Sequence, residues 1–362
     1  MRKPVVMTLL ATLPFLALAA LPSPAGADEI DDLIERGAWK QARGAVAELA
    51  AKSPGDARTF YLQSRIELAF SHPDPALAAA EKAVALEPRN GRYHFQLAEV
   101  LGSTAQRAGK LKAFSLARRF KKEAEAALAL DPGLDDARWS LMEFYSIAPG
   151  IVGGDGKKSR AMADEIAKRD PVRGLLAQAQ LALRAKHEAE AIALYQRAVE
   201  MDPKNYPARV SLARLLGSDT QKKYDQVEAH ARAALEIDPR RSGGYAILAG
   251  LYAHLERWAE LDEMLARAER GIPGNLTPHY QAGRILLTDG RQLERAERYL
   301  RQYLTVEPEG SAPSAAHAHW RLGNVLEKQG RKPEALAELE TSLRLNPDLD
   351  EAKKDLKRVK RG

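Results

Sequence analysis

Few residues of this 362-residue chain are arranged for catalysis or metal binding. It has no cysteine, which excludes thiol nucleophiles, disulfides and cysteine-ligated zinc. Of eight histidines only His317 and His319 stand close, and residues two apart point to different sides of a helix. A glycine-rich stretch, 150–156, resembles a phosphate loop, but Ile151 and Lys158 replace its first glycine and its Ser/Thr. The sequence predicts no enzyme, no metal and no cofactor, and a catalytic site at this stretch is the weakest alternative.

Basic residues gather in one segment, because no acidic residue occurs between Glu99 and Glu123. Such a patch suits an acidic lipid, polymer or protein, and it is also the pattern of a solvated helix face. The net charge of +6 falls to only +4 without residues 1–27, which favours the solvated face. The patch consists of Arg107, Lys110, Lys112, Arg118, Arg119, Lys121 and Lys122.

Prolines divide the rest of the chain into units of similar length. Nine of them are separated by 34, 44, 39, 32, 36, 34, 35 and 39 residues, so three steps read as one unit plus an insertion. Self-similarity at such a period is typical of stacked-repeat architectures. The prolines are Pro54, Pro88, Pro132, Pro171, Pro203, Pro239, Pro273, Pro308 and Pro347.

The residues around the prolines predict two helices in each unit. Seven prolines follow Asp, Glu or Asn, a pair that starts a turn and ends the preceding helix. Alanine recurs five and twelve residues before many of them, and Leu-small pairs recur after them, as at Leu97-Ala98 and Leu322-Gly323. Gly37, Gly290 and Gly330 separate the two helical segments. We therefore expect an all-α chain.

This pattern resembles the tetratricopeptide repeat (TPR) family, most closely from His319 to Pro347. The resemblance covers nearly everything after residue 28. It implies a right-handed superhelical solenoid of about nine helical hairpins, with a concave groove lined by the first helix of each hairpin. Some units lack the expected alanines, for example at Phe120 and Tyr303, so their local packing is expected to differ.

The resemblance also implies that a partner lies along the concave face. Residues seven, ten and eleven after each proline fall near that face, where aromatics supply apolar anchors and arginines bind carboxylates. Arg321 and Asn324 match part of a carboxylate clamp found in some members, and the alternative for the aromatics is packing between helices. The candidate groove residues are Arg58, Tyr61, Arg65, Arg92, Phe95, Trp139, Tyr280, Arg284, Trp320, Arg321 and Asn324.

The two ends of the chain differ from the repeats. Residues 1–27 combine a basic start, an apolar run and a small-residue site after Ala27, which predicts a cleaved signal peptide, with a membrane anchor as the alternative. Residues 28–347 form the expected solenoid, with insertions near 102–122, 149–158 and 309–314, the last interpreted as a linker. Residues 348–362 are expected to form a basic capping helix.

These features together predict a non-enzymatic scaffold of the bacterial cell envelope. We expect a periplasmic protein, with secretion as the alternative, and no transmembrane segment once the signal is cleaved. The expected partner is a protein or peptide in the groove. Binding of an anionic lipid or envelope polymer through residues 107–122 is the second hypothesis, and an exported protein is not expected to bind nucleic acid.

Overall fold

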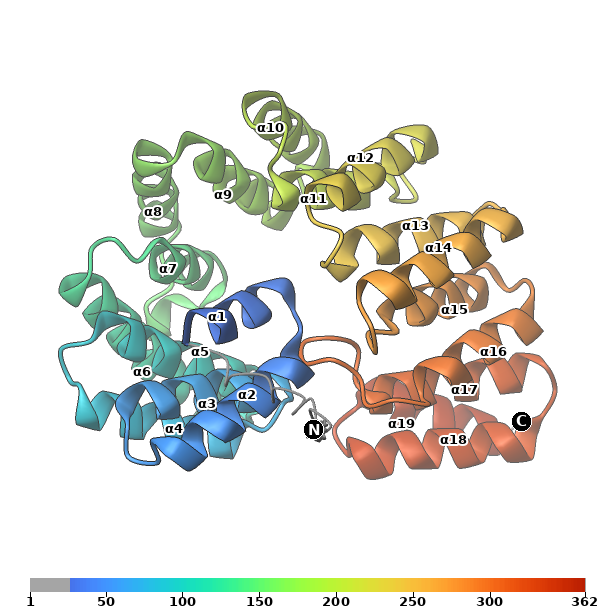
Figure 1. The fold of residues 1–362 in the computed structure, drawn as a ribbon, viewed down its shortest axis with the longest axis horizontal. Helices are drawn as coiled ribbons and strands as arrows, with labels where there is room; N and C mark the ends of the chain where they lie inside the picture. The colour runs from blue at the N-terminus through green and yellow to red at the C-terminus, as the bar shows by residue number, and fades with distance from the viewer. Residues whose placement is uncertain (1–26, 362) are drawn as a thin grey trace, which may run out of the picture.

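The computed structural model describes residues 27–361, and every regular element within them is a helix (Figure 1). The predicted signal peptide, except for Ala27, lies outside these described residues. The helices are α1 (Ala27–Arg36), α2 (Trp39–Lys52), α3 (Ala57–Ala69), α4 (Pro73–Leu86), α5 (Gly91–Arg107), α6 (Lys110–Leu130), α7 (Asp135–Ile147), η1 (Gly150–Val152), α8 (Gly156–Arg169), α9 (Pro171–Arg184), α10 (Glu188–Met201), α11 (Tyr206–Leu216), α12 (Tyr224–Ile237), α13 (Ser242–His254), α14 (Trp258–Gly271), α15 (Thr277–Asp289), α16 (Leu293–Tyr303), α17 (Ala315–Lys328), α18 (Lys332–Leu345) and α19 (Asp350–Arg361).

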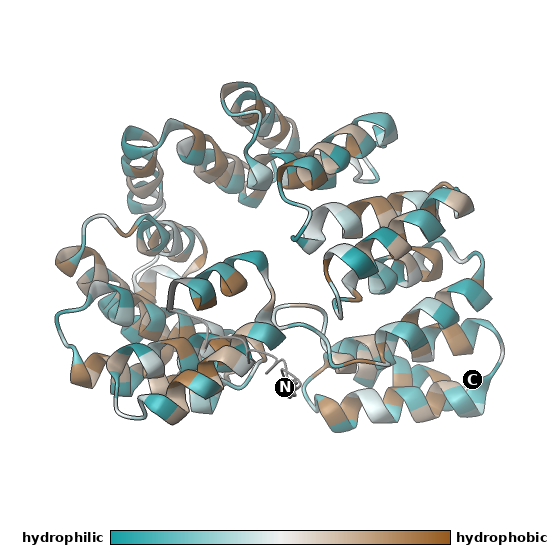
Figure 2. Cartoon of the chain, in the orientation of Figure 1, coloured by the Kyte–Doolittle hydropathy of each residue, from teal (hydrophilic) through white to brown (hydrophobic). Residues whose placement is uncertain are grey.

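The expected all-α solenoid of hairpins is confirmed, whereas its handedness and the number of repeats stay predictions. Successive helices pack in pairs from α1 with α2 to α17 with α18, and first helices of adjacent pairs also touch, as α3 does α5. Apolar and polar residues alternate along each helix (Figure 2), as amphipathic packing requires. None of the helices in residues 27–361 is both long and apolar enough to cross a bilayer.

The turns form where the sequence predicts them. Asp170 ends α8 through its backbone N–H, and its carboxylate accepts the Arg173 N–H at 2.9 Å, which caps α9. Gly37, Gly290 and Gly330 have φ of +79°, +66° and +78°, the left-handed region that glycine adopts without strain. One residue type thus ends the first helix in each of these three pairs. In other pairs an acidic residue before proline ends the second helix, as Glu87 does for α4 and Asp202 for α10.

The small residues of the Leu-small pairs let paired helices approach closely. A Cβ built on Gly323 of α17 lies 2.8 Å from Cγ of Leu339 on α18. A Cβ on Gly283 of α15 lies 2.9 Å from Cγ of Leu300 on α16. Because real Cβ contacts are longer than this, a side chain at either glycine would separate the two helices.

The segment interpreted as a linker instead joins the two ends of the solenoid. The connection between α16 and α17 reaches α2 and α3 (Figure 1). There the Lys40 N–H donates to Glu309 Oε2 at 2.9 Å, the Ser311 N–H donates to the Ala69 carbonyl at 2.9 Å, and Arg43 pairs with Glu307. The linker interpretation was wrong, because this segment binds α2 and α3. The sequence pattern gave no sign of these contacts, since the partners are far away in sequence.

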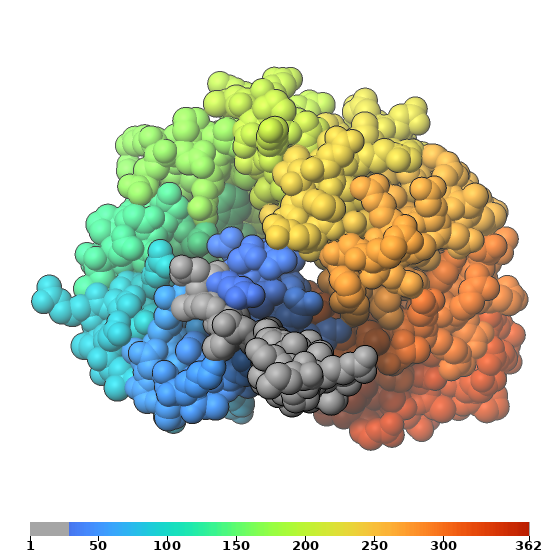
Figure 3. All heavy atoms as spheres, viewed as in Figure 1, coloured from blue at the N-terminus to red at the C-terminus, as the bar shows by residue number. Residues whose placement is uncertain are grey.

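Packing around this connection is tight enough to require glycine. A Cβ on Gly310 would lie 2.9 Å from the Cβ atoms of both Ala69 and Trp39. Lys40 Nζ donates to the carbonyls of Gly274 and Glu307, at 2.8 and 2.9 Å. The solenoid therefore closes into a ring, with a narrow opening visible between the blue N-terminal and the orange segments in the space-filling view (Figure 3). We call the contact of residues 307–311 with α2 and α3 the seam.

Candidate functional site

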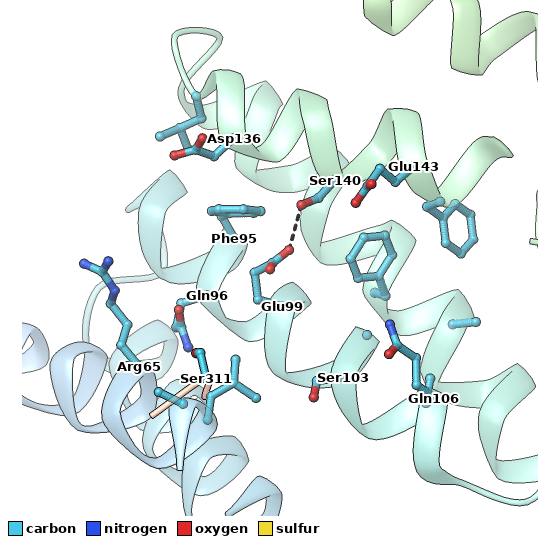
Figure 4. Close-up of a pocket in the computed structure, with 18 of the residues that line it drawn as sticks. Arg65, Phe95, Gln96, Glu99, Ser103, Gln106, Asp136, Ser140, Glu143 and Ser311 are labelled. Carbon is cyan, nitrogen blue, oxygen red and sulfur yellow. Dashed lines mark hydrogen bonds between the residues drawn. The ribbon is translucent and has the colours of Figure 1, made fainter. Parts of the chain in front are cut away.

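A cavity of about 1190 Å³ lies on the inner side of the N-terminal half (Figure 4). First helices α3, α5 and α7 supply much of its wall, with additional residues from α1, α6, α9 and the turns beside α7. Trp39 and Ser311, both at the seam, also line it. The seam that closes the ring therefore forms one border of this cavity.

Helical spacing turns a single face of each wall helix toward the cavity. Arg92, Phe95, Gln96, Glu99 and Ser103 of α5 all line it, at steps of three, one, three and four residues. The lining residues of α7 follow the same spacing. They are Asp135, Asp136, Ser140, Glu143, Phe144 and Ile147.

Carboxylates and hydroxyls form the middle of the cavity. Glu99 accepts a hydrogen bond from the Ser140 hydroxyl at 2.8 Å (Figure 4). Burial raises the pKa of Glu99, and the neighbouring charges of Glu143 and Asp136 raise it further. Glu143 pairs with Arg184 at 3.0 Å and Asp136 pairs with an arginine of α9, whereas no Lys or Arg in the described residues pairs with Glu99.

One end of the cavity is apolar, and the predicted insertion near 102–122 builds much of it. Phe120 packs on Phe144 with ring centroids 5.1 Å apart. Two more apolar side chains are only partly covered, Phe114 being 37% and Ile147 56% exposed. The lengthened α6 therefore adds an open apolar surface directly beside the carboxylates.

The other end combines aromatics with arginines. Tyr61 packs on Tyr93, with centroids 5.1 Å apart, and the Arg65 guanidinium lies 5.6 Å from the Tyr61 ring. Arg65 also donates to Asp31 of α1 at 2.8 Å. Arg92 is exposed at the same end of α5. This end can offer both a flat apolar surface and a cation.

Four of the eleven predicted groove residues line the cavity: Tyr61, Arg65, Arg92 and Phe95. Arg58 donates to Asp31 at 2.9 Å, so it ties α3 to α1. Trp139 packs in a small cluster with Met142 and Ile166, between α7 and α8. The sequence thus places the groove on the correct helices, and neighbouring positions decide which side chains reach the cavity.

The five predicted residues of the C-terminal half do not line this cavity, and neighbouring side chains contact them. Tyr280 is 4% exposed and packs on Tyr303, and burial lowers the pKa of Arg284. Asp355 of α19 accepts hydrogen bonds from the Trp320 indole at 2.7 Å and from the Asn324 amide at 2.9 Å.

The guanidinium of Arg321 lies 3.9 Å from the Trp320 ring. The capping helix α19 therefore already accepts hydrogen bonds from two of the predicted groove residues, Trp320 and Asn324.

Sequence reasoning missed the carboxylates in the middle of the cavity. Glu99 and Glu143 stand eleven residues after Pro88 and Pro132, the same register that selects Arg65 and Arg284. Only Arg65, Arg284 and the last-unit equivalent Asn324 were predicted at that register. Considering acidic residues as well at the eleventh position after each proline would have identified both Glu99 and Glu143.

The predicted basic patch lies on α5 and α6, outside the carboxylate-lined part of the cavity. Arg119 pairs with Glu81 at 2.8 Å, Arg107 donates to the Ser71 hydroxyl at 3.1 Å, and Arg118 donates to the Ile151 carbonyl at 3.4 Å. Among the lysines of the patch, Lys110, Lys112 and Lys122 are exposed, and Lys121 Nζ lies 3.8 Å from a carboxylate oxygen of Glu125.

The close histidine pair is used in local contacts. His319 lies 2.6 Å from a carboxylate oxygen of Glu338, and His317 lies 2.8 Å from the Ser314 hydroxyl. In the part of the chain that the structure describes, no group of three or more His, Asp or Glu side chains is arranged to hold a metal ion.

The comparison with protein-family models agrees with the repeat pattern in two segments. The family model described as tetratricopeptide repeat matches residues 153–206 and 280–350. A thermophilic TPR protein of Thermus thermophilus is 22% identical, with 52% of this chain and 98% of that chain covered and a TM-score of 0.41. Yeast Tom70 is 13% identical, with 92% and 87% covered and a TM-score of 0.49. No curated protein matches the sequence significantly.

The matched segments run from α8 to the start of α11 and from within α15 to the start of α19, so each contains one complete helix pair, α9 with α10 and α17 with α18. The same proline-bounded unit extends through the segments that the family model leaves unmatched. Two segments, which together make up less than half of the chain, are therefore similar to the tetratricopeptide repeat family.

Proposed function

We propose that the chain is a non-enzymatic scaffold that binds an extended segment of a partner protein in the cavity of its N-terminal half. TPR proteins generally act as protein-interaction scaffolds. The observation that carries the proposal is the composition of the cavity, in which aromatic, arginine and carboxylate side chains of three first helices converge. Aromatic and arginine side chains are enriched among the few residues that supply most of the binding energy in protein interfaces.

The size of the cavity supports a peptide more than a small metabolite. Sites for small molecules usually measure about 300–1000 Å³ and enclose their ligand. This cavity holds about 1190 Å³ and has polar groups in its middle and at one end. A segment of several residues would fill it and satisfy those groups.

A photo-crosslinker tests this proposal at a single position. The crosslinking amino acid replaces Phe95 in the cavity or, as a control, Leu86, which is 52% exposed on α4. The proposal expects one defined product from Phe95 that the control does not give and that Tyr61→Ala reduces. Identical products from both positions would place the interaction elsewhere.

We also propose that the protein acts in the bacterial periplasm. Support comes from the signal-like pattern of residues 1–27 and the absence of cysteine from a chain rich in alanine and arginine. Cell fractionation and N-terminal sequencing of the recovered protein test this location. A mature chain starting at Asp28 in the periplasmic fraction is the expected result, and an intact cytoplasmic chain would contradict it.

A second candidate function is binding of anionic lipid or envelope polymer by the basic patch. The observation that favours it is Leu111, which is 87% exposed at the start of α6 between Lys110 and Lys112. An apolar side chain between two cations suits an anionic membrane surface.

Vesicle co-sedimentation with anionic and neutral lipids, at low and high salt, tests it. The double variant Lys110→Glu, Lys112→Glu should abolish binding to anionic vesicles, and unchanged sedimentation would refute this function.

A further inference from the structure

We infer that the cavity selects partner segments in which an apolar residue and a lysine or arginine stand two positions apart. This inference rests on the proposed function, because it names the chemistry of the segment bound in the cavity. It depends on two adjacent features of the wall, a carboxylate without a cation and an apolar surface without a cover.

The cation would bind at Glu99. Its neighbours Asp136 and Glu143 each already have an arginine partner, from α9. Glu99 has only the Ser140 hydroxyl, although it lies in the same carboxylate-rich part of the cavity. A buried carboxylate is stabilised most by a cation that also donates hydrogen bonds, which is what an ammonium or guanidinium provides.

The apolar residue would bind next to it, on the surface formed by Phe114, Phe120, Phe144 and Ile147. Phe114 and Ile147 remain 37% and 56% exposed although both line a cavity. An aliphatic or aromatic side chain placed there would remove this surface from water, at about 25 cal/mol for each Å² buried.

The wall helices set the spacing between the two subsites. Phe144 follows Ser140, the hydrogen-bond partner of Glu99, by four residues, and one helical turn advances about 5.4 Å. A Cβ built on Gly102, three residues after Glu99, lies 3.0 Å from the Phe120 ring. The subsites are thus about one to two turns apart, and side chains two residues apart on an extended chain are separated by roughly 6.5–7 Å.

Immobilised synthetic peptides test this inference with the full mature chain. The array varies two positions of an otherwise Ser/Ala decapeptide, and the best peptides are then measured in solution by fluorescence anisotropy. Leu-Ala-Lys and Lys-Ala-Leu cores are compared with cores in which norleucine or Glu replaces Lys, or Ser replaces Leu. We expect the Lys core to bind on the order of tenfold more tightly than its norleucine counterpart, as for a charge-assisted hydrogen bond.

Two variants separate the subsites. Glu99→Gln should remove the preference for Lys over norleucine while the preference for Leu over Ser remains. Ile147→Ser should do the reverse. Glu236→Gln, which changes an exposed glutamate of α12 outside the cavity, is the matched control and should leave both preferences unchanged.

Failure of the inference differs from failure of the proposed function. If peptides bind and compete with one another but Glu99→Gln leaves the Lys preference intact, the inference is overturned and groove binding stands. If no peptide binds the parent chain and the Phe95 crosslinker yields no product, the proposed function itself is overturned. Circular dichroism melts confirm that each variant is folded.

Discussion

Glutamates of this protein differ in acidity because their neighbours differ. Glu228 of α12 accepts hydrogen bonds from Arg257 at 2.6 Å, Arg232 at 2.7 Å and Tyr252 at 2.9 Å. These donors lower its pKa to about 2, although burial acts in the opposite direction. Glu99 lacks such donors apart from one hydroxyl, and burial raises its pKa. The first glutamate joins α12 to α13 and to Arg257 in the turn before α14, and the second is available to a ligand.

Glu228 should contribute stability that acid removes. Its folded-state pKa lies below the ordinary value of 4.5, so its stabilising effect is present above pH 4.5 and is lost as pH falls toward 2. We expect Glu228→Gln to lower the free energy of unfolding by roughly 1–2 kcal/mol at pH 7. Urea unfolding of parent and variant at pH 7 and pH 3 measures this difference, which should shrink at pH 3.

Glu236→Gln serves as the control on the same helix, since Glu236 is exposed. A difference of equal size for Glu228→Gln at both pH values would contradict the assignment.

Two glycine-to-alanine changes should have opposite effects on stability. Gly323→Ala places a Cβ 2.8 Å from Leu339, and overpacking of this kind costs about 1–3 kcal/mol. Gly44 lies within α2, and apart from its chain neighbours and the backbone of its own helix no atom lies within 4 Å of a built Cβ. Gly44→Ala should therefore stabilise by about 0.5–1 kcal/mol. Thermal melts of both variants measure the signs, and destabilisation by Gly44→Ala or a neutral Gly323→Ala would refute the packing argument.

At the scale of elements, α2 depends on a residue that lies far away in sequence. Its N-terminus has no side-chain cap of its own, and Glu309 accepts the Lys40 N–H there. A carboxylate at a helix N-terminus also interacts favourably with the helix dipole. Glu309 therefore acts as the cap of α2.

Glu309→Ala should lower stability by about 1 kcal/mol, the usual cost of losing a cap. Hydrogen exchange of the Lys40 amide should become faster, because its acceptor is gone. Asp56→Ala is the matched control, since Asp56 caps α3 from the adjacent position by accepting the Thr59 N–H. Faster exchange at Lys40 in the control but not in Glu309→Ala would contradict the role assigned to Glu309.

The helices could be predicted from the sequence because their signals are local. Acidic residues before proline, glycines such as Gly37, and alanine at fixed positions act within one unit. The seam could not be predicted in this way. Its bonds join Ala69 to Ser311 and Lys40 to Glu309, and no periodicity relates residues that far apart.

The site could be predicted only in part, because some of its features are local in sequence and others are not. The repeat register locates the inner helices and therefore Tyr61 and Phe95, but the depth of the cavity depends on the lengthened α6 and on the seam. The register also selects Trp320, which the capping helix engages through Asp355. Packing between units decides which positions on a first helix remain accessible. The sequence pattern of a single unit carries no information about that packing.

The whole molecule has a joint that differs from the stacking of its units. Within residues 27–361, the helices of the solenoid pack against neighbouring helix pairs, whereas the seam joins the α16–α17 connection to α2 and α3. Repeat proteins without such a contact flex along their length, because each unit touches only its neighbours. The seam should therefore restrict this flexing and fix the width of the cavity that Trp39 and Ser311 border.

Locking and opening the seam should change the shape of the molecule in opposite ways. The natural chain has no cysteine, so the double variant Ala69→Cys, Ser311→Cys would contain a single disulfide. The Ser311 N–H bonds to the Ala69 carbonyl at 2.9 Å, which places the two backbones within the range that a disulfide spans. We expect the oxidised form to melt at a higher temperature than its own reduced form, since a crosslink closing a long loop stabilises by up to about 4–5 kcal/mol.

The double variant Arg43→Ala, Glu309→Ala removes the ion pairs Arg43–Glu307 and Lys40–Glu309 and the cap of α2. Small-angle X-ray scattering should show a larger radius of gyration for it than for the parent. Lys360→Ala, Glu340→Ala is the matched control, because that exposed pair at the opposite end of the chain joins only α18 and α19. If the disulfide forms readily and the Arg43/Glu309 variant keeps the parent's radius, then backbone contacts at Gly310 and Ser311 alone hold the ring. If the disulfide does not form under oxidising conditions, the two ends are apart in solution and the cavity is an open groove.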